Sequence, residues 1–71
     1  MNNKEKSNKI RAIIKELKEK GFEYKIFWNA CGMNKTNFYN FTTGKISLKN
    51  KEIILLETFL KDNFNIEPEK F

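Results

Sequence analysis

The chain has 71 residues and a formal net charge of +5, with 39% hydrophobic and 14% aromatic residues. A chain of this length forms a single domain with a small core, because it buries only about 60% of its unfolded surface. No apolar run approaches the roughly 20 residues that span a bilayer, which argues against a membrane segment. A single cysteine forms no internal disulfide and no secretory segment opens the sequence, so we expect a reduced, cytoplasmic, soluble protein.

The first predicted helix covers residues 7–20. The residues before it are polar and charged without an apolar anchor, so about residues 1–6 are expected to be flexible. Ser7 is the expected N-cap, and Gly21 follows the helix as its C-terminal stop. Apolar residues at i, i+3, i+4 and i+7 predict one buried face. That face comprises Ile10, Ile13, Ile14 and Leu17.

Two short helices are expected next, at residues 24–31 and 35–43. Gly32 separates them, Asn34 is suited to cap the second, and Gly44 ends it. Such a pair of helices joined by a glycine-containing turn is a helix-turn-helix. The residues expected to face inward are Ile26, Phe27, Ala30, Cys31, Met33, Phe38 and Phe41.

The last predicted helix runs from Lys49 or Asn50 to Asn63. Its main apolar stripe comprises Ile53, Leu56, Leu60 and Phe64. Leu55 and Phe59 form a second stripe, which is either buried in the monomer or a dimer contact; burial is favoured because a small domain needs the area. A flexible tail is expected over about residues 66–71, with Pro68 marking the end of order. The predicted fold class is all-α, a compact bundle of four to five helices.

Positive charge is concentrated in the middle of the chain. Residues 24–51 contain five lysines and no acidic residue, whereas residues 52–71 are net acidic. A basic patch on one element is typical of a protein that binds a polyanionic partner. An alternative is that the lysines only keep a small domain soluble. That alternative explains a scattered excess of lysine well, but it explains a block of 28 residues without an acidic residue less well. The bias toward lysine, asparagine, isoleucine and phenylalanine also hints at a low-GC bacterium, or one of its phages or plasmids.

Composition argues against an enzyme. The chain has no histidine, one aspartate and one cysteine, and its acidic residues are scattered. No nucleophile–base pair or metal-ligand spacing is present, so we expect no catalytic residue, metal, cofactor or small-molecule substrate. Cys31 is interpreted as a small buried apolar residue, with a redox switch as the less favoured alternative.

The segment from Tyr24 to Lys45 resembles the helix-turn-helix of the lambdoid phage repressor and Cro family, also called the XRE-type regulators. The sequence Thr43-Gly44-Lys45 is similar to the Asn-Gly-Lys that follows the family's recognition helix. The preceding and following helices also fit, so the resemblance covers about residues 7–64. It implies a lambda-repressor-like fold and a single DNA-binding domain over residues 1–71. The apolar and turn positions that carry the resemblance are Phe27, Cys31, Gly32, Met33, Phe38 and Phe41.

The resemblance implies that the chain is a Cro- or repressor-like transcriptional regulator of double-stranded DNA. Such proteins commonly bind as dimers on two half-sites; here a homodimer would use helix four, the tail or the DNA itself. The residues placed by the resemblance against base edges are Lys35, Thr36, Tyr39 and Asn40. Those placed against phosphates are Tyr24, Asn34, Lys45 and Lys49.

Trp28 departs from the family pattern, which usually has alanine where the two helices touch. An indole there either opens the helix crossing, turns aside to cap the core, or accompanies a slipped register. Tyr24 stands where the family often has a phosphate-binding glutamine. Trp28 and the aromatic surface also favour an alternative function, a protein-binding module on the same scaffold. That module would be an antirepressor, an antitoxin-like partner or a phage inhibitor of a host protein.

Overall fold

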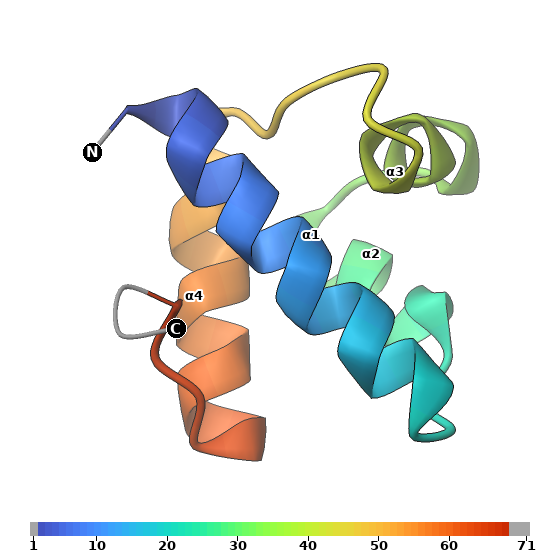
Figure 1. Cartoon of the computed structure of the whole chain (residues 1–71), viewed down its shortest axis with the longest axis vertical. Coiled ribbons are helices and arrows are strands. Elements are labelled where there is room, and N and C mark those ends of the chain that lie inside the picture. The colour runs from blue at the N-terminus through green and yellow to red at the C-terminus, as the bar shows by residue number, and fades with distance from the viewer. Residues whose placement is uncertain (1, 69–71) are drawn as a thin grey trace.

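The computed structural model describes residues 2–68 and shows a small bundle of helices (Figure 1). The helices are α1 (Asn3–Glu19), α2 (Tyr24–Cys31), α3 (Lys35–Thr42) and α4 (Asn50–Phe64). No strand occurs between residues 2 and 68, which confirms the predicted all-α class. None of the helices in this range is long and apolar enough to cross a membrane.

The first helix begins four residues earlier than predicted. Asn2 Oδ1 accepts a hydrogen bond from the backbone N–H of Glu5 at 2.9 Å, so Asn2 is the N-cap. Ser7 is fully buried instead, and its hydroxyl accepts a hydrogen bond from the backbone N–H of Leu48 at 2.8 Å. The N-cap prediction for Ser7 is therefore wrong. A serine hydroxyl suits a helix cap, but it equally satisfies a buried backbone donor from another segment.

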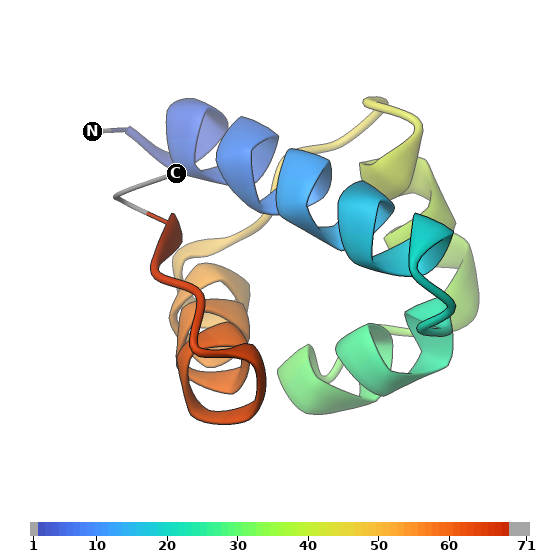
Figure 2. The same cartoon turned by 60° about the horizontal axis from the view of Figure 1, so that its bottom comes forward.

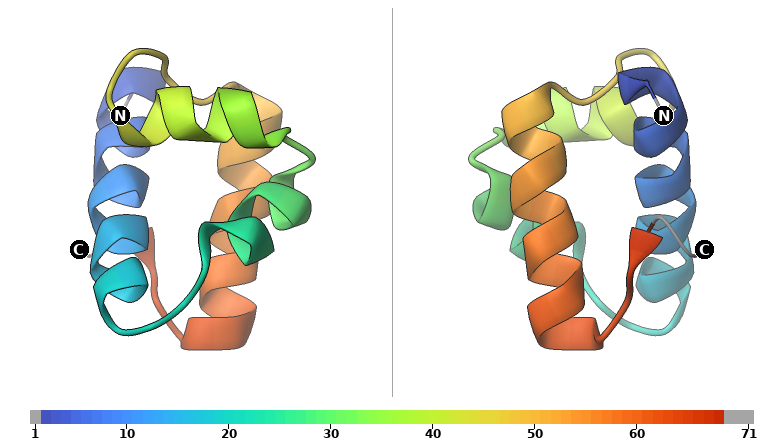
Figure 3. Two further views of the ribbon diagram at one scale, coloured as in Figure 1. Left: turned by 90° about the vertical axis from the view of Figure 1, so that its right-hand side faces the viewer. Right: turned by 90° about the vertical axis from the view of Figure 1, so that its left-hand side faces the viewer.

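The core lies between α1, α2 and α4, and α3 closes one end of it (Figure 3). The prediction of burial from apolar spacing is confirmed for most of the inward-facing residues, but Ile26, Ala30 and Phe64 are only half-buried. The core also includes Leu48 from the loop before α4. Full burial of each large side chain contributes roughly 1.5–3 kcal/mol. The buried apolar residues are Ile10, Ile13, Ile14, Leu17, Phe27, Cys31, Met33, Phe38, Phe41, Leu48, Ile53, Leu56 and Leu60.

The second apolar stripe of α4 is divided between core and surface. Phe59 is half-buried and packs edge-on against Phe27, with the ring centroids 5.8 Å apart. Leu55 remains 36% exposed, and its neighbour Ile54 is 61% exposed. The monomer thus buries one member of the predicted stripe and leaves the other at the surface.

Beyond α4 the chain turns back at Asn65, which has the left-handed φ of 56°. It then runs between α4 and α1, as Figures 2 and 3 show. Ile66 packs against the core and Pro68 is buried, so the core extends into the region predicted to be a tail. Met1 and residues 69–71, which belong to the two segments predicted to be flexible, lie outside the described residues.

Helix α3 crosses one end of the bundle, on the side of the molecule opposite to α4 (Figures 1 and 3). One long face of α3 is therefore left uncovered by the other helices.

Candidate nucleic-acid interface

The turn between α2 and α3 is built on Gly32. This residue ends α2 in the left-handed conformation with φ of 74°, and the N–H of Met33 donates to the carbonyl of Trp28 at 3.0 Å. A Cβ at Gly32 would meet no atom within 4 Å. Glycine is therefore favoured here by the backbone conformation and not by a lack of space.

The short α3 helix is fixed at its start and along its inner side. Asn34 Oδ1 accepts a hydrogen bond from the N–H of Asn37 at 2.8 Å, which confirms Asn34 as the N-cap. Phe38 and Phe41 are fully buried. The amide nitrogen of Asn34 makes no bond in this cap and has two hydrogens to donate to an acceptor such as a phosphate.

The four residues assigned to base readout lie together on the outer side of α3. Their spacing of i, i+1, i+4 and i+5 places them on one helical face. Three of them are exposed and Asn40 is half-buried. The residues are Lys35, Thr36, Tyr39 and Asn40.

The residues assigned to phosphate contact are divided between two places. Asn34 precedes α3, and Lys45 and Lys49 are exposed in the loop between α3 and α4. Tyr24 lies instead at the start of α2, half-buried among aromatic rings. Asn34 and Lys45 thus adjoin the two ends of α3, Lys49 directly precedes α4, and the Tyr24 ring packs against Tyr39 with the centroids 5.8 Å apart.

Arg11 is a residue of this site that the sequence analysis missed. From α1 its Nε donates to the carbonyl of Phe41 at 2.6 Å, and its Nη2 donates to the carbonyl of Ile46 at 3.1 Å. Its Cζ lies 4.9 Å from the centroid of the Phe41 ring, a cation–π contact. The guanidinium thus adds a donor to the Phe41 carbonyl, which also accepts from the N–H of Gly44 at 3.1 Å, and ties the Ile46 carbonyl of the following loop to α1.

Ser7 and Arg11 act on the same segment of the chain. They are four residues apart on α1, so they share a face of that helix. Ser7 holds the N–H of Leu48, and Arg11 holds the carbonyl of Ile46. The available signal in the sequence was that Arg11 is the one arginine among many lysines, and only arginine offers a planar fork of donors.

Trp28 lies at the surface junction of α2 and α3. Its ring is half-buried and lies 6.0 Å from Phe38 and 6.1 Å from Tyr39, measured between centroids. The bounds of α2 and the position of Gly32 match the expected register, so no slip accompanies the indole. Of the alternatives for Trp28, the structure shows a side chain that packs against the core from its edge.

Tyr24, Trp28 and Tyr39 line a shallow hollow of about 280 Å³, together with two lysines and Glu23. Lys18 Nζ lies 5.4 Å from the Tyr24 ring centroid, and Lys35 Nζ lies 5.9 Å from that of Tyr39. Burial, with a smaller effect of Tyr39 and Glu19, raises the pKa of Tyr24 above its ordinary value. Its phenol therefore stays neutral near pH 7 and keeps its hydrogen to donate.

Cys31 has the environment of a structural thiol. It is buried, and its Sγ lies 3.8 Å from the carbonyl oxygen of Trp28. Burial raises its pKa to about 11. A thiolate is the reactive form of cysteine, so this side chain is poorly suited to redox chemistry at neutral pH.

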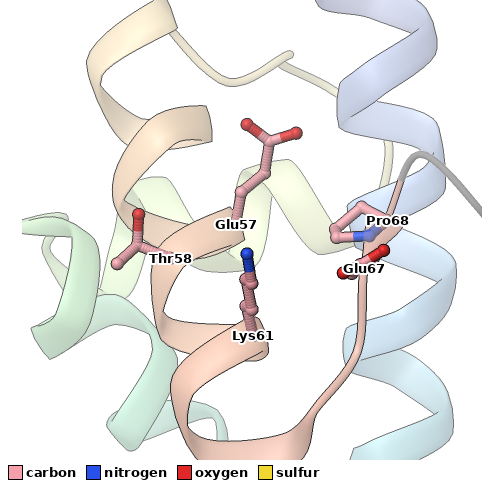
Figure 4. Close-up of a pocket in the computed structure, with 5 residues that line it drawn as sticks. All are labelled: Glu57, Thr58, Lys61, Glu67 and Pro68. Carbon is pink, nitrogen blue, oxygen red and sulfur yellow. The ribbon is translucent and has the colours of Figure 1, made fainter.

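A second hollow, of about 180 Å³, lies between α4 and the returning tail (Figure 4). Its walls carry both acidic and basic side chains. Among residues 2–68, no group of three or more histidine, cysteine or acidic side chains is placed to hold a metal ion. The lining residues are Glu57, Thr58, Lys61, Glu67 and Pro68.

The sequence matches no known protein family, and neither a curated protein nor a solved structure is significantly similar to it. The functional interpretation therefore rests on the geometry and charge of α3 and its flanking loops.

Proposed function

We propose that the protein is a sequence-specific, double-stranded DNA-binding transcriptional regulator that reads the major groove with α3. The observation that carries this proposal is the outer face of α3, where four polar side chains lie together on a helix held by buried aromatic residues. α3 lies within residues 24–51, a segment that contains five lysines and no acidic residue. A major groove about 12 Å wide admits one α-helix.

Each outer side chain has a chemical role in this proposal. The Asn40 amide suits paired hydrogen bonds to adenine, and the Lys35 ammonium suits guanine acceptors. The Thr36 methyl suits the thymine methyl, and Tyr39 contacts a base edge or a phosphate.

The residues on either side of α3 position the helix on the duplex. Lys45 and Lys49 contribute charge to the backbone contacts, and the Asn34 amide nitrogen donates to a phosphate. The N–H groups at the start of α3 add to this, because a helix N-terminus attracts anions. As a regulator the protein acts in the cytoplasm of a bacterial host cell, and the bias toward lysine, asparagine, isoleucine and phenylalanine favours a low-GC bacterium or one of its phages or plasmids.

Selection of random duplex DNA by the purified protein tests this proposal. We expect a recurring sequence motif that includes A·T pairs, and we expect Asn40→Ala to relax the motif at one position. Lys15→Ala, which removes an exposed lysine of α1, serves as the control and should leave the motif unchanged. Recovery of unselected sequence by the unaltered protein would contradict the proposal.

The aromatic surface favours a second candidate, a protein-binding module. Tyr39 is 41% exposed and adjoins Trp28 and Tyr24, and tyrosine and tryptophan are the residues that most often anchor protein interfaces. The salt response separates the two functions. The affinity for DNA falls steeply with salt concentration because counterions are released, whereas a contact anchored by aromatic rings responds weakly.

A further inference from the structure

Beside the outer face of α3 lies a surface whose composition the DNA-binding proposal does not explain. It is the hollow of about 280 Å³ at the junction of α2 and α3, which we call the aromatic hollow. This volume is close to the lower end, about 300 Å³, of the range for small-molecule pockets, so it suits a small ligand. The lining residues are Lys18, Glu23, Tyr24, Lys25, Trp28 and Tyr39.

The rings of the aromatic hollow meet one another at steep angles. The planes of Tyr24 and Tyr39 are 76° apart, and those of Trp28 and Tyr39 are 57° apart. Trp28 meets the buried Phe38 at 61°. Among residues 2–68, no ring is therefore stacked in parallel on the indole, which is half-buried. Trp28 can offer a face to a planar ring from a ligand.

Lysines give the aromatic hollow a positive edge. Lys18 and Lys25 line it, and Lys18 Nζ lies 5.4 Å from the centroid of a tyrosine ring in its wall. Lys35 adds a third ammonium group, because its Nζ lies 5.9 Å from the centroid of the Tyr39 ring. In the described part of the chain, none of these three lysines forms an ion pair with an acidic side chain. Their charges are available to an anionic group of a ligand.

Glu23 is the one acidic side chain among the residues that line the aromatic hollow between positions 2 and 68. It is exposed, and although it precedes α2 its carboxylate accepts no capping hydrogen bond. An ionised carboxylate only accepts hydrogen bonds, and its two oxygens can take a parallel pair of N–H donors. Guanine presents such a pair on one edge, its ring N–H and its amino group. Adenine and cytosine present an amino group beside a ring nitrogen that accepts.

We propose that the aromatic hollow binds a guanine nucleotide, with the base stacked on Trp28 and the phosphate beside Lys18 and Lys25. The donor edge of the base faces Glu23. The nucleotide is bound unchanged, and no reaction is involved. The lysines favour this occupant over an aromatic side chain of a protein partner, because such a side chain brings no negative charge to them.

NMR titration of the full chain with guanosine monophosphate (GMP), without duplex DNA, tests the proposal. Trp28 is the one tryptophan in the sequence, so its indole N–H gives a single signal that reports on the aromatic hollow. GMP added to roughly 10 mM should shift this signal to saturation with a dissociation constant on the order of 1 mM. Nuclear Overhauser contacts between the indole and the C8 proton of guanine should show the stacking. Ribose 5-phosphate, which lacks the base, should shift the signal little.

Two variants that keep Trp28 test the charged partners. Lys25→Ala should raise the dissociation constant for GMP by roughly threefold, as expected for an exposed charge pair. Inosine monophosphate lacks only the amino group and should bind the unaltered protein roughly threefold more weakly than GMP; Glu23→Gln should abolish that difference. Lys15→Ala, on exposed α1, is the matched control and should leave the dissociation constant unchanged. The dispersion of the amide signals confirms that each variant is folded.

A free nucleotide and an unpaired guanine of a nucleic-acid strand share this chemistry, and a second titration separates them. It compares a single strand of about five nucleotides, one guanine among thymines, with an all-thymine strand of the same length. A guanine strand that binds more tightly than both GMP and the all-thymine strand identifies the strand as the ligand. Otherwise, binding of GMP identifies the free nucleotide.

Two results would overturn the proposal. In the first, GMP shifts the indole signal no more than ribose 5-phosphate does, and the guanine strand no more than the all-thymine strand. In the second, GMP binding is unaffected by both Lys25→Ala and Glu23→Gln. The rings would then be left to a protein partner. Since no duplex is present, neither result bears on DNA binding by α3, and a failed selection of duplex DNA would equally leave the aromatic hollow as a nucleotide site.

Discussion

Replacement of Arg11 by methionine should destabilise the whole domain although the residue is partly exposed. Methionine keeps the apolar stem over Phe41 but removes the guanidinium. The change removes donors to two backbone carbonyls, those of Phe41 and Ile46, and the cation–π contact with the Phe41 ring. The hydrogen bond to Asn8 is also lost, but that bond is exposed and contributes little.

The expected loss of unfolding free energy follows from these contacts. A hydrogen bond from a charged donor contributes roughly 1.5–3 kcal/mol when buried. Discounting for exposure gives about 1 kcal/mol for the part-buried bond to Phe41 and roughly 0.5 kcal/mol for the exposed bond to Ile46, and the cation–π contact adds roughly 0.5–1 kcal/mol. The total of about 2 kcal/mol corresponds to a decrease in Tm of roughly 8–16 °C for a domain of this size.

Thermal and urea denaturation followed by circular dichroism at 222 nm measure this loss. Arg11→Lys should recover part of the stability, because an ammonium reaches one carbonyl but lacks the forked geometry. Lys15→Met is the matched control on the same helix and should change the unfolding free energy by less than about 0.5 kcal/mol. The reasoning is refuted if Arg11→Met is as stable as the control.

Four further changes test other parts of the structure. Ser7→Ala leaves the N–H of Leu48 buried without its acceptor and should lower the unfolding free energy in urea by about 1–3 kcal/mol; an unchanged urea midpoint would contradict that contact. Gly32→Ala should destabilise by about 1–2 kcal/mol in a thermal melt, owing to its left-handed conformation, and a neutral result would argue against that turn. Asn40→Ala should weaken binding to the selected duplex by roughly 1–3 kcal/mol while affecting unrelated duplexes little, as measured by fluorescence anisotropy. Lys45→Ala should weaken all duplexes alike and reduce the slope of log affinity against log salt by about 1; an unchanged slope would remove it from the phosphate contacts.

Much of the fold could be predicted from the sequence because the strongest signals are local. The bounds of α2 and the start of α4 agree with the prediction, since Gly32 and the spacing of apolar residues act over one or two turns. α3 ends one residue earlier than expected, at Thr42, with Thr43 as its C-cap. The early start of α1 also had a local signal that was not used, because Asn2 is followed three positions later by Glu5.

The contacts that hold α3 in place could not be predicted in the same way. The bonds from Arg11 and Ser7 join residues 30 to 41 positions apart. Local propensity contains no information on such pairs, and an arginine on a helix surface usually points to solvent. The outer face of α3 was predictable because it follows from helix periodicity alone, whereas the packing of Tyr24 and Trp28 depends on how the helices meet.

The hydrogen bonds that attach α3 to α1 do not depend on which side chains α3 presents outward. Arg11 binds the carbonyls of Phe41 and Ile46, and a carbonyl is offered by every amino acid at those positions. Thr36 and Asn40 could therefore be exchanged for other residues without loosening the attachment of their helix. The scaffold can acquire a new recognition sequence by substitutions on one face, while the parts that support it remain as they are.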